Sequence, residues 1–537
     1  MTPADEALEA HRALVRALGR PGAWPEALPP GASFEVIETH ISTLLLAGDS
    51  AIKLKKPVAL PFLDFSTPDL RRHFCEEELR INRRTAPDLY RAVLPVTGHV
   101  HAPRLGGDGP AIDWALWMRR FDNDQLYDRL ARRGRLTAAH IDALAGVVAG
   151  FHAGLPPSPA GYGSADVARR WALDNFASLR DPGTASALPD AAREQLATLA
   201  GSSDSRLAGI APLLERRRAG GAVAECHGDL HLGNIVQHEG RPLLFDAIEF
   251  NPELRHMDRL NDVAFTFMDL LDHGLPRLAW RLLSQYLERT GDYAGLPLLR
   301  WFAVDRALVR AKVALLSARQ VPDSEARQAV AAAARRIALA YALAHPAPPQ
   351  LIVTSGLSGS GKSTVALLLS GALGAVRIRS DVERKRLHGM APTERPADPT
   401  RLYNPRATAD TYGRLVNAAR AALDGGVSAV VDAAFLRRAE RDAVRALGCE
   451  RRVACTVVEC TAPAELLTAR IGQRQARQSD PSDADTGVLA LQMRVREPLA
   501  PDEDDALTFS TAGPEDSLPG LVDALVTQLG GTPLPPA

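Results

Sequence analysis

Apolar runs in the first third of the chain are short and separated by polar turn residues, a pattern typical of strands. Residues 34–38 and 44–54 predict the two arms of a hairpin that turns at residues 39–43. Helical periodicity then begins. Thr67 followed by Pro68 predicts a helix start, because threonine caps the first amide groups and proline suits the first turn. The N-terminal part therefore combines strands with a helix.

The helix that begins after Thr67 has carboxylates on its apolar face. At helical spacing, three apolar residues mark this face: Leu70, Phe74 and Ile81. Glu77 and Glu78 fall on the same face, and a carboxylate that points inward needs a cationic partner. Lys53, in the preceding apolar run, is the natural partner. The pattern does not decide whether Glu77 or Glu78 forms the pair.

Strands and helices alternate in the second half of the chain. Apolar runs at 351–355, 375–381, 429–432 and 457–460 predict four strands, and residues 362–373 predict a helix after the first of them. This alternation predicts an α/β fold with a doubly wound parallel sheet, in which ligands bind at the carboxyl ends of the strands. The first half lacks the alternation, so we expect an α+β fold there.

A proline-rich segment separates the two patterns. Residues 346–349 follow an alanine-rich helical stretch at 324–344, and such proline-rich segments are stiff spacers. We therefore predict one domain over residues 1–345 and a second over 350–537, held at a limited range of distances. Within the first domain, residues 201–205 (GSSDS) predict a surface loop.

Composition excludes several classes of protein. The chain has 537 residues, 46% of them hydrophobic, and a formal net charge of −1, so no overall field attracts nucleic acid or anionic lipid. No apolar run approaches the ~20 residues of a membrane-spanning helix. Residues 1–20 predict an amphipathic helix and not a signal peptide. The five cysteines lack metal-ligand spacing, which favours a reducing, cytoplasmic setting.

Residues 227–234, with the sequence HGDLHLGN, form the first candidate site. Asp229 can accept the proton of an attacking hydroxyl group, and Asn234, five residues later, can ligate magnesium. Residues 243–246 predict a buried strand that ends in Asp246, which is placed to hold a magnesium ion bridging phosphates. This order and spacing of residues predicts phosphoryl-transfer chemistry.

Residues 356–363, with the sequence GLSGSGKS, form a second candidate site, a P-loop. The motif follows a predicted strand and opens a predicted helix, which is the context that it requires. Its glycines let backbone amides face a phosphate, Lys362 reaches the β- and γ-phosphates, and Ser363 binds magnesium. The predicted nucleotide-binding residues are Gly356, Ser358, Gly359, Ser360, Gly361, Lys362, Ser363 and Thr364.

Two acidic residues end later strands of the predicted parallel sheet. Asp381 and Asp432 lie at the strand edge that carries the P-loop, where one suits a substrate hydroxyl group and the other magnesium or its water. Arg384 follows Asp381 in the next helix. Three later arginines share one helix face: Arg470, Arg474 and Arg477. This face predicts a lid over the phosphates, ended by a helix-breaking segment at 478–483.

Residues 34–345 resemble the aminoglycoside-phosphotransferase branch of the protein-kinase-like fold, through the HGDLHLGN loop and the acid at position 246. The resemblance implies a strand-rich lobe at about 34–118 and a helical lobe at about 121–345. Asp258 or Asp262 is then expected to cap or brace the catalytic loop.

The same resemblance implies the nucleotide contacts of the first half. Lys53 would hold the α- and β-phosphates. The strand 114–121 would lead into the hinge, where the backbone near Met118 would bind adenine. One departure is the phosphate-covering turn at 38–43, which has no glycine, whereas protein kinases use GxGxxG there.

The second half resembles the gluconate-kinase and zeta-toxin group of P-loop kinases. The resemblance implies that Asp381 deprotonates a hydroxyl group and that Arg384 positions the substrate. Asp432, the other strand-end acid, is then left for magnesium or its water. The fused arrangement resembles bacterial proteins described as bifunctional aminoglycoside phosphotransferase and ATP-binding proteins. That description does not establish an aminoglycoside substrate.

These features predict a cytoplasmic phosphotransferase with two nucleotide sites, which uses ATP or GTP with Mg²⁺ and acts on hydroxyl groups of small molecules. No nucleic acid or membrane partner is expected, and the sequence does not indicate the oligomeric state. Three alternatives stay open. One domain could be a regulatory nucleotide-binding module, the P-loop domain could phosphorylate nucleic-acid ends, or the first domain could transfer AMP.

Overall fold

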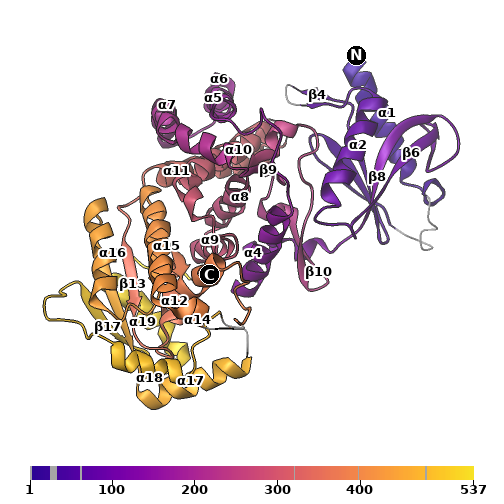
Figure 1. Ribbon diagram of the computed structural model, residues 1–537. Coiled ribbons are helices and arrows are strands. Elements are labelled where there is room, and N and C mark those ends of the chain that lie inside the picture. Colours follow the sequence, from indigo (N-terminus) through magenta and orange to yellow (C-terminus); the bar gives the residue numbers. More distant parts are fainter. Residues whose placement is uncertain are drawn as a thin grey trace.

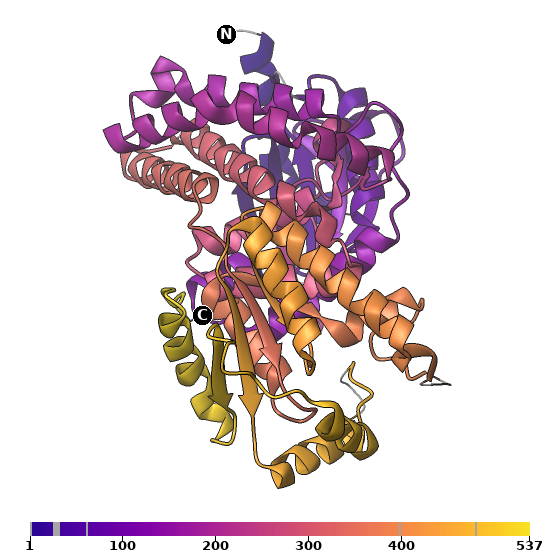
Figure 2. The same ribbon diagram turned by 60° about the vertical axis from the view of Figure 1, so that its left-hand side comes forward.

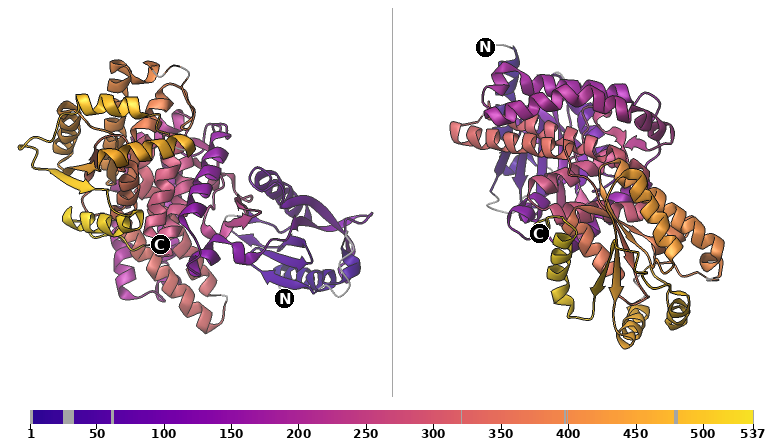
Figure 3. Two further views of the ribbon diagram at one scale, coloured as in Figure 1. Left: turned by 90° about the horizontal axis from the view of Figure 1, so that it is seen from below. Right: turned by 90° about the vertical axis from the view of Figure 1, so that its left-hand side faces the viewer.

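The computed structural model describes residues 3–24, 33–60, 63–319, 321–396, 398, 400–477 and 481–536. The chain forms a strand-rich lobe, a helical region and a parallel-sheet region, in that order (Figure 1). Long helices of the first half lie across one end of the parallel-sheet region (Figure 2). Seen from below, the helical region separates the strand-rich lobe from the parallel-sheet region (Figure 3).

One six-stranded antiparallel sheet forms the strand-rich lobe, with the strand order β1-β2-β3-β8-β6-β7. Its strands are β1 (Glu35–Glu38), β2 (Ser42–Ala47), β3 (Ser50–Lys55), β6 (Tyr90–His99), β7 (Ala102–Leu105) and β8 (Ala111–Arg119). Helix α2 (Pro68–Asn82) packs on β6 and β8, and α1 (Pro3–Leu18) packs on β7. Thr67 caps α2 by accepting a hydrogen bond from the Leu70 amide, as predicted.

The predicted hairpin is wrong in its second arm. Residues 44–54 do not form one strand, because β2 and β3 are separate antiparallel strands that pair Ala47 with Ser50. The turn between them contains Gly48 at φ +53°. Glycine adopts this left-handed conformation without steric cost, and a glycine after an apolar run is a hairpin signal. The continuous apolar character of both strands concealed the turn.

Helices build most of the region that follows. They are α3 (Tyr127–Arg132), α4 (Ala138–Ala153), α5 (Ala165–Arg180), α6 (Pro182–Ala185), α7 (Asp190–Ala219), α8 (Arg259–Asp272), α9 (Pro276–Thr290), α10 (Leu296–Ala318) and α11 (Asp323–Ala344). Short strands interrupt them: β9 (Val223–Glu225), β10 (Ile235–His238), β11 (Arg241–Leu244) and β12 (His256–Asp258). The helix predicted at 324–344 is confirmed as α11.

The loop predicted at residues 201–205 is wrong, because these residues lie inside α7. Serine, glycine and aspartate favour turns in isolation. Here Leu199, Ser203 and Leu207 are buried, and α7 packs on α5 and α11. The tertiary packing of this helix face therefore outweighs the local preference of these residues for a turn.

A five-stranded parallel sheet forms the centre of the second half, in the order β14-β15-β13-β16-β17. The strands are β13 (Leu351–Ser355), β14 (Ala375–Arg379), β15 (Ser428–Asp432), β16 (Cys455–Thr461) and β17 (Ala506–Ser510). The helices are α12 (Lys362–Leu373), α13 (Ser380–Leu387), α14 (Thr400–Tyr403), α15 (Pro405–Asp424), α16 (Arg438–Arg451), α17 (Ala464–Arg477), α18 (Thr486–Val495) and α19 (Leu518–Gln528).

Both faces of this sheet are covered by helices, which confirms the doubly wound α/β fold. Side chains of α12 and α19 share a buried cluster with Ile352, Val430 and Val458 of the sheet. Helices α15 and α16 pack on the strands from the other face. Strand β17 was not predicted, and β14 ends at Arg379 and not at Asp381, so Asp381 lies in the first turn of α13.

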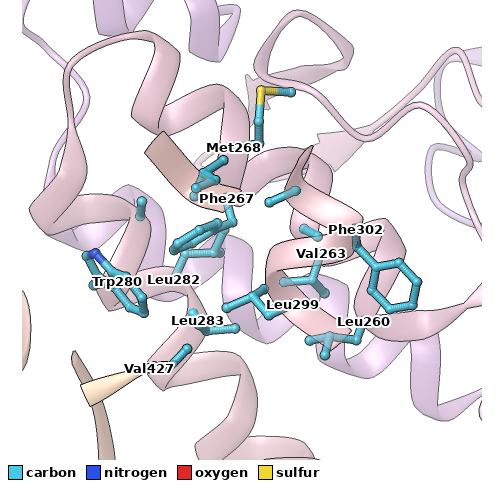
Figure 4. Close-up of a cluster of buried hydrophobic side chains, with 14 of the residues drawn as sticks. Leu260, Val263, Phe267, Met268, Trp280, Leu282, Leu283, Leu299, Phe302 and Val427 are labelled. Atoms are coloured by element: carbon cyan, nitrogen blue, oxygen red, sulfur yellow. The ribbon is translucent and has the colours of Figure 1, made fainter. Parts of the chain in front are cut away.

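The two halves share one hydrophobic core and are not held apart by the proline-rich segment. A single buried cluster runs from α4 through α8, α9 and α10 into the parallel sheet. Figure 4 shows Val427, from the second half, at the edge of side chains from α8, α9 and α10. Helix α9 also packs on α12 and β14, and α10 packs on α15. The expected spacer therefore connects two bodies in direct contact.

Candidate active sites

Helix α8 fixes the backbone of the 227–234 loop. Asp262 accepts hydrogen bonds from the amides of His227, at 3.1 Å, and Gly228, at 2.9 Å. One and two turns later, Thr266 donates to the Leu230 carbonyl and Asp269 accepts from the Leu232 amide. Of the two residues expected to brace this loop, Asp258 and Asp262, it is Asp262 that does so. Asp258 instead caps α8, where it accepts a hydrogen bond from the Leu260 amide.

The side chains of Asp229 and Asn234 meet within this loop. Asn234 Nδ2 donates to Asp229 Oδ2 at 3.0 Å and to the Asp229 carbonyl at 2.9 Å. Burial disfavours the charged form of Asp229. The neighbouring His231 outweighs burial, so the pKa of Asp229 lies below its ordinary value. Asp229 is therefore a carboxylate at neutral pH, the form that can accept a proton.

A hairpin brings Asn234 close to the acid of the next segment. Strands β10 and β11 pair Ile235 with Leu244, and the Phe245 amide donates to the Asn234 carbonyl at 3.0 Å. Asp246 follows directly, with φ +61°, a left-handed conformation that is uncommon for aspartate. The Asp246 amide donates to the Tyr90 hydroxyl oxygen at 3.0 Å, which holds this conformation.

Lys53 joins Asp246 to helix α2. Its Nζ lies 2.7 Å from Glu78 Oε1 and 2.7 Å from Asp246 Oδ1. Glu77 is not the partner, because it accepts hydrogen bonds from Arg80 and Arg255. Burial lowers the pKa of Lys53, but Asp246 and Glu78 outweigh burial, so the pKa is raised well above its ordinary value. Lys53 therefore stays charged between Glu78 and Asp246.

A second lysine, which the sequence pattern did not single out, lies behind this pair. Lys55 Nζ donates to Glu78 Oε2 at 2.8 Å and also to Glu249. All three side chains are almost completely buried. Lys53 and Lys55 are two residues apart, so they point to the same face of β3. This spacing, in a chain that has few lysines, was the available signal.

We expect Lys55→Met to destabilise the strand-rich lobe by ~3–5 kcal/mol, because it removes one partner from a buried ionic cluster and leaves carboxylates unpaired. Urea unfolding followed by tryptophan fluorescence measures the loss. Lys56→Met is the matched control, because Lys56 pairs with the exposed Glu38 and its loss should cost at most about 1 kcal/mol. Equal losses in the two variants would contradict a structural role for the cluster.

The glycine-free turn between β1 and β2 is closed by a side chain. Ser42 donates its amide to Thr39 Oγ1 at 3.0 Å, and the Thr39 amide donates to the Ser42 carbonyl at 2.9 Å. At the tip, His40 Nε2 lies 2.6 Å from Ser317 Oγ at the end of α10. The turn therefore reaches from the strand-rich lobe to the helical region. Threonine supplies the turn geometry that glycine supplies in protein kinases.

The expected hinge follows the central strand β8. Met118 pairs with Ala51 of β3 on one side and with Tyr90 of β6 on the other. Phe121, just beyond the strand, packs against Phe245 with 5.0 Å between ring centroids. The hinge segment therefore lies next to the segment that carries Asp246.

The P-loop of the second half connects β13 to α12. Gly356, Gly359 and Gly361 all have positive φ values. A Cβ atom on Gly359 would lie 2.6 Å from the Leu467 carbonyl oxygen, so only glycine fits there. Lys362 Nζ donates to the Leu357 carbonyl at 2.7 Å, within the loop itself. Burial lowers the pKa of Lys362 below its ordinary value.

Ser363 and Asp432 meet at the base of the P-loop. Ser363 Oγ donates to Asp432 Oδ1 at 3.1 Å. The other oxygen, Oδ2, is buried and has no hydrogen-bond partner among the described residues; Arg379 Nε lies 3.5 Å from it. Burial raises the pKa of Asp432 above its ordinary value, although Arg379 and Arg377 oppose this shift. A buried carboxylate oxygen beside a hydroxyl group suits the hard oxygen ligation that Mg²⁺ requires.

Asp381 and Arg384 lie on α13, beside the P-loop. Burial lowers the pKa of Lys362, and the charge of Asp381 is among those that oppose this shift. Arg384 is buried, donates to the Leu402 carbonyl at 2.8 Å, and lies over the Tyr403 ring at 4.9 Å. Its Nε has no hydrogen-bond partner among the described residues.

One arginine of the α17 face, Arg470, contacts the P-loop. Arg470 donates to the Gly359 carbonyl at 3.4 Å and to Thr511, and Arg474 donates to the Ala484 carbonyl at 2.8 Å. The side chain of Arg477 and residues 478–480 lie outside the described residues. Gln492 of α18 was not foreseen: its Oε1 accepts a hydrogen bond from the Ser358 amide at 2.7 Å. One amide of the phosphate cradle is thus occupied by a side-chain oxygen.

Known proteins match both halves of the chain. The model of the family described as "AAA domain" matches residues 351–499. Over 487 residues, the chain is 30% identical to uncharacterized proteins of Mycobacterium tuberculosis and Mycobacterium bovis, and the match covers 90% of this chain and 93% of theirs. The chain belongs to the family of these mycobacterial proteins. The match is longer than either half, so the family shares the fused arrangement.

Solved structures resemble parts of the chain. A sugar kinase from Janibacter sp. is 22% identical, with 34% of this chain and 95% of that chain covered and a TM-score of 0.27. A choline kinase from Cryptosporidium parvum is 11% identical, with 62% of this chain and 93% of that chain covered and a TM-score of 0.39. Among the residues that the structure describes, no helix is long and apolar enough to cross a bilayer.

Proposed function

We propose that the chain is an ATP-dependent, Mg²⁺-dependent phosphotransferase with two separate nucleotide sites, each of which acts on a hydroxyl group of a small molecule. The observation that carries the proposal is the cluster at the first site. Asp229 contacts Asn234 there, and the adjoining segment carries Asp246 bound to Lys53. These residue types in these positions are those that phosphoryl transfer uses in kinase-like sites.

At the first site, we assign Asp229 as the base that accepts the proton of the acceptor hydroxyl group. Asn234 and Asp246 would ligate Mg²⁺, and Lys53, held by Glu78, would bind the nucleotide phosphates. The backbone near Met118, beyond the end of β8, would contact the base of ATP or GTP. The ion pair between Lys53 and Glu78 supports this assignment, because it fixes the ammonium group beside Asp246.

At the second site, the P-loop residues with Thr364 would bind the nucleotide phosphates, and Ser363 with Asp432 would ligate Mg²⁺. Asp381 would act as the base, and Arg384 would position the substrate. Arg470 and Arg474 would close over the phosphates from α17. The partly unsatisfied polar atoms of Asp432, Arg384 and Arg474 support this assignment, because each leaves bonding capacity for a ligand.

We propose domain limits of 1–345 and 350–537, with residues 346–349 as the connection. The first domain divides into a strand-rich lobe at about 34–118 and a helical lobe at about 121–345. The change from an antiparallel to a parallel sheet supports these limits.

Mass spectrometry of a metabolite extract incubated with the protein and Mg-ATP tests the proposed activity. We expect two new species, each heavier than its precursor by one phosphate. A gain of AMP instead would assign AMP transfer to the first site. Nucleotide binding with no new phosphorylated species from either site would contradict the proposal and favour a regulatory module.

We expect Asp381→Asn to retain ATP binding at the second site and to lose phosphoryl transfer there by about 10²–10⁴-fold, because the variant keeps the shape of a base and removes its charge. The measurement compares the transfer rate with the ATP affinity in one preparation. If the variant lost ATP binding instead, Asp381 would be a magnesium ligand and Asp432 would be the better candidate for the base.

A further inference from the structure

Helix α10 lies beside the 227–234 loop of the first site. The guanidinium group of Arg306 lies over the Phe265 ring, 5.2 Å from the ring centroid. The ring centroids of Phe265 and His231 are 5.7 Å apart, and His231 Nε2 lies 3.4 Å from Asp229 Oδ2. Two side chains therefore separate this part of α10 from the proposed base.

The next turn of α10 carries Arg310 and lies beside the end of α8. Arg336 of α11 donates to the Arg310 carbonyl at 3.3 Å and to Asp272 at 2.8 Å, so it joins the two helices. In the same part of α8, Asp269 accepts a hydrogen bond from the Leu232 amide. Arg310 therefore lies alongside the turn of α8 that holds the catalytic loop.

The same face of α10 reaches the phosphate-covering turn of the strand-rich lobe. Ser317 Oγ, near the end of α10, lies 2.6 Å from His40 Nε2. At about 100° per residue, Arg306, Arg310 and Ser317 project within roughly 40° of one another. Arg310 is therefore on a helix face that extends from the catalytic loop to the turn that would cover the nucleotide phosphates.

Neither arginine on this face has an acidic partner. Among the described residues, Arg306 and Arg310 form no ion pair, and Arg306 donates to neutral atoms, Asn261 Oδ1 at 2.9 Å and Met257 Sδ at 3.2 Å. Arg310 Nε is buried and has no hydrogen-bond partner within the described part of the chain. Like charges one turn apart destabilise a helix, and a polar atom buried without a partner costs free energy. An anion bound at Arg310 would offset both effects.

The charge of Arg310 also acts on the proposed base. Burial raises the pKa of Asp229, and the charges of His231 and Arg310 are among those that lower it. A cationic acceptor would be repelled by this charge, whereas an anionic group would be attracted. The nucleotide phosphates have a cation of their own on the other lobe, because Lys53 is held 2.7 Å from Asp246 Oδ1. Arg310 is therefore left for the acceptor.

We propose that Arg310 is a substrate-binding residue of the first site, whose guanidinium group binds a phosphate or carboxylate group of the hydroxylated acceptor. The first site then acts on an anionic small molecule and not on a polyamine such as an aminoglycoside. A planar guanidinium group matches the geometry of either anionic group. This inference rests on the proposed function of the first site.

Fractionation of the metabolite extract tests the charge of the acceptor. An anion-exchange resin divides the extract into a bound, anionic fraction and an unbound fraction, and each is incubated with the full-length protein and Mg-ATP. The first-site product is the phosphorylated species that Asp229→Ala fails to make, and we expect it from the anionic fraction alone. Its formation from the unbound fraction would overturn the inference. Its absence from both fractions would instead overturn the proposed function of the first site.

Arg310→Met tests the residue itself, because it keeps an unbranched side chain and removes the charge. Loss of a hydrogen bond to a charged group should raise the amount of the anionic fraction needed for half-maximal formation of the first-site product by about 10–10²-fold. The ATP requirement of this reaction and the second-site product should not change. Lys312→Met is the matched control, because it removes another cation of α10, which pairs with Asp174.

Three results would overturn the role of Arg310: an unchanged acceptor requirement in Arg310→Met, an equal change in Lys312→Met, or a raised ATP requirement in place of a raised acceptor requirement. The last result would assign Arg310 to the nucleotide phosphates. If Arg310→Met makes no first-site product at any amount of the fraction, Arg310→Lys decides. This variant keeps the charge and should make the product, and its failure to do so would also overturn the inference.

Discussion

Asp229→Ala should abolish phosphoryl transfer at the first site while leaving ATP binding there intact. The carboxylate is half-buried, charged and held by Asn234 Nδ2 at 3.0 Å, so it is oriented to accept a proton. Loss of a positioned base lowers rates by about 10²–10⁴-fold. Lys53, Glu78 and Asp246 form their own contacts and should still bind nucleotide.

Mass spectrometry of the metabolite extract incubated with Mg-ATP tests this prediction. Of the two phosphorylated species expected from the wild type, the one made by the first site should disappear in Asp229→Ala, and the other should persist. Asp174→Ala is the control, because Asp174 is a half-exposed carboxylate that pairs with Lys312 on the helical region. Wild-type production of both species by Asp229→Ala would contradict the assignment of the 227–234 loop.

Lys362→Ala should remove nucleotide binding from the second site and leave the first site unchanged. Its ammonium group lies inside the P-loop, 2.7 Å from the Leu357 carbonyl, where a phosphate would attract it. A hydrogen bond to a charged group contributes about 1.5–3 kcal/mol, so we expect ATP affinity to fall by about 10–10²-fold. Transfer at the second site should fall further, since the charge also stabilises the transferring group.

Photolabelling with azido-ATP checks the site specificity of this loss. Second-half peptides should lose the label in Lys362→Ala, and first-half peptides should keep it. Lys312→Ala, which removes a lysine on α10 far along the chain from the P-loop, serves as the control. Loss of label from both halves in Lys362→Ala would show that the sites are not independent.

Local sequence was sufficient where one segment contains the whole signal. Strand β13, the P-loop and α12 follow one another directly along the chain. One short stretch of sequence therefore contains the complete pattern of strand, glycine-rich turn and helix. The cap at Thr67 and the helix α11 are equally local. The kinase-like and P-loop folds were both predicted from such windows, and the structure has both.

Contacts between distant segments were beyond local patterns. Lys53 and Lys55 share Glu78, but only the folded sheet shows that Glu249, almost 200 residues later, completes the cluster. The choice of Glu78 over Glu77 depends on Arg255, which lies equally far along the chain. Such pairs depend on the register of β3 and the rotation of α2, which periodicity does not define to one residue.

The sequence pattern did not predict the direct contact between the two halves. A proline-rich segment indicates stiffness, but it does not say whether the flanking bodies touch. The residues that join them lie on α9, where Ser284 and Glu288 look like ordinary polar positions of an amphipathic helix. Arg377 and Arg379 in a buried strand were the missed signal, because two charges on one strand face need a partner.

Titration calorimetry of the full-length protein with Mg²⁺ and a non-hydrolysable ATP analogue tests the proposal of two nucleotide sites most directly. We expect two equivalents of nucleotide per chain in the wild type and one in Lys362→Ala. A single equivalent in the wild type would contradict two functional nucleotide sites, and retention of that equivalent in Lys362→Ala would place it in the first half.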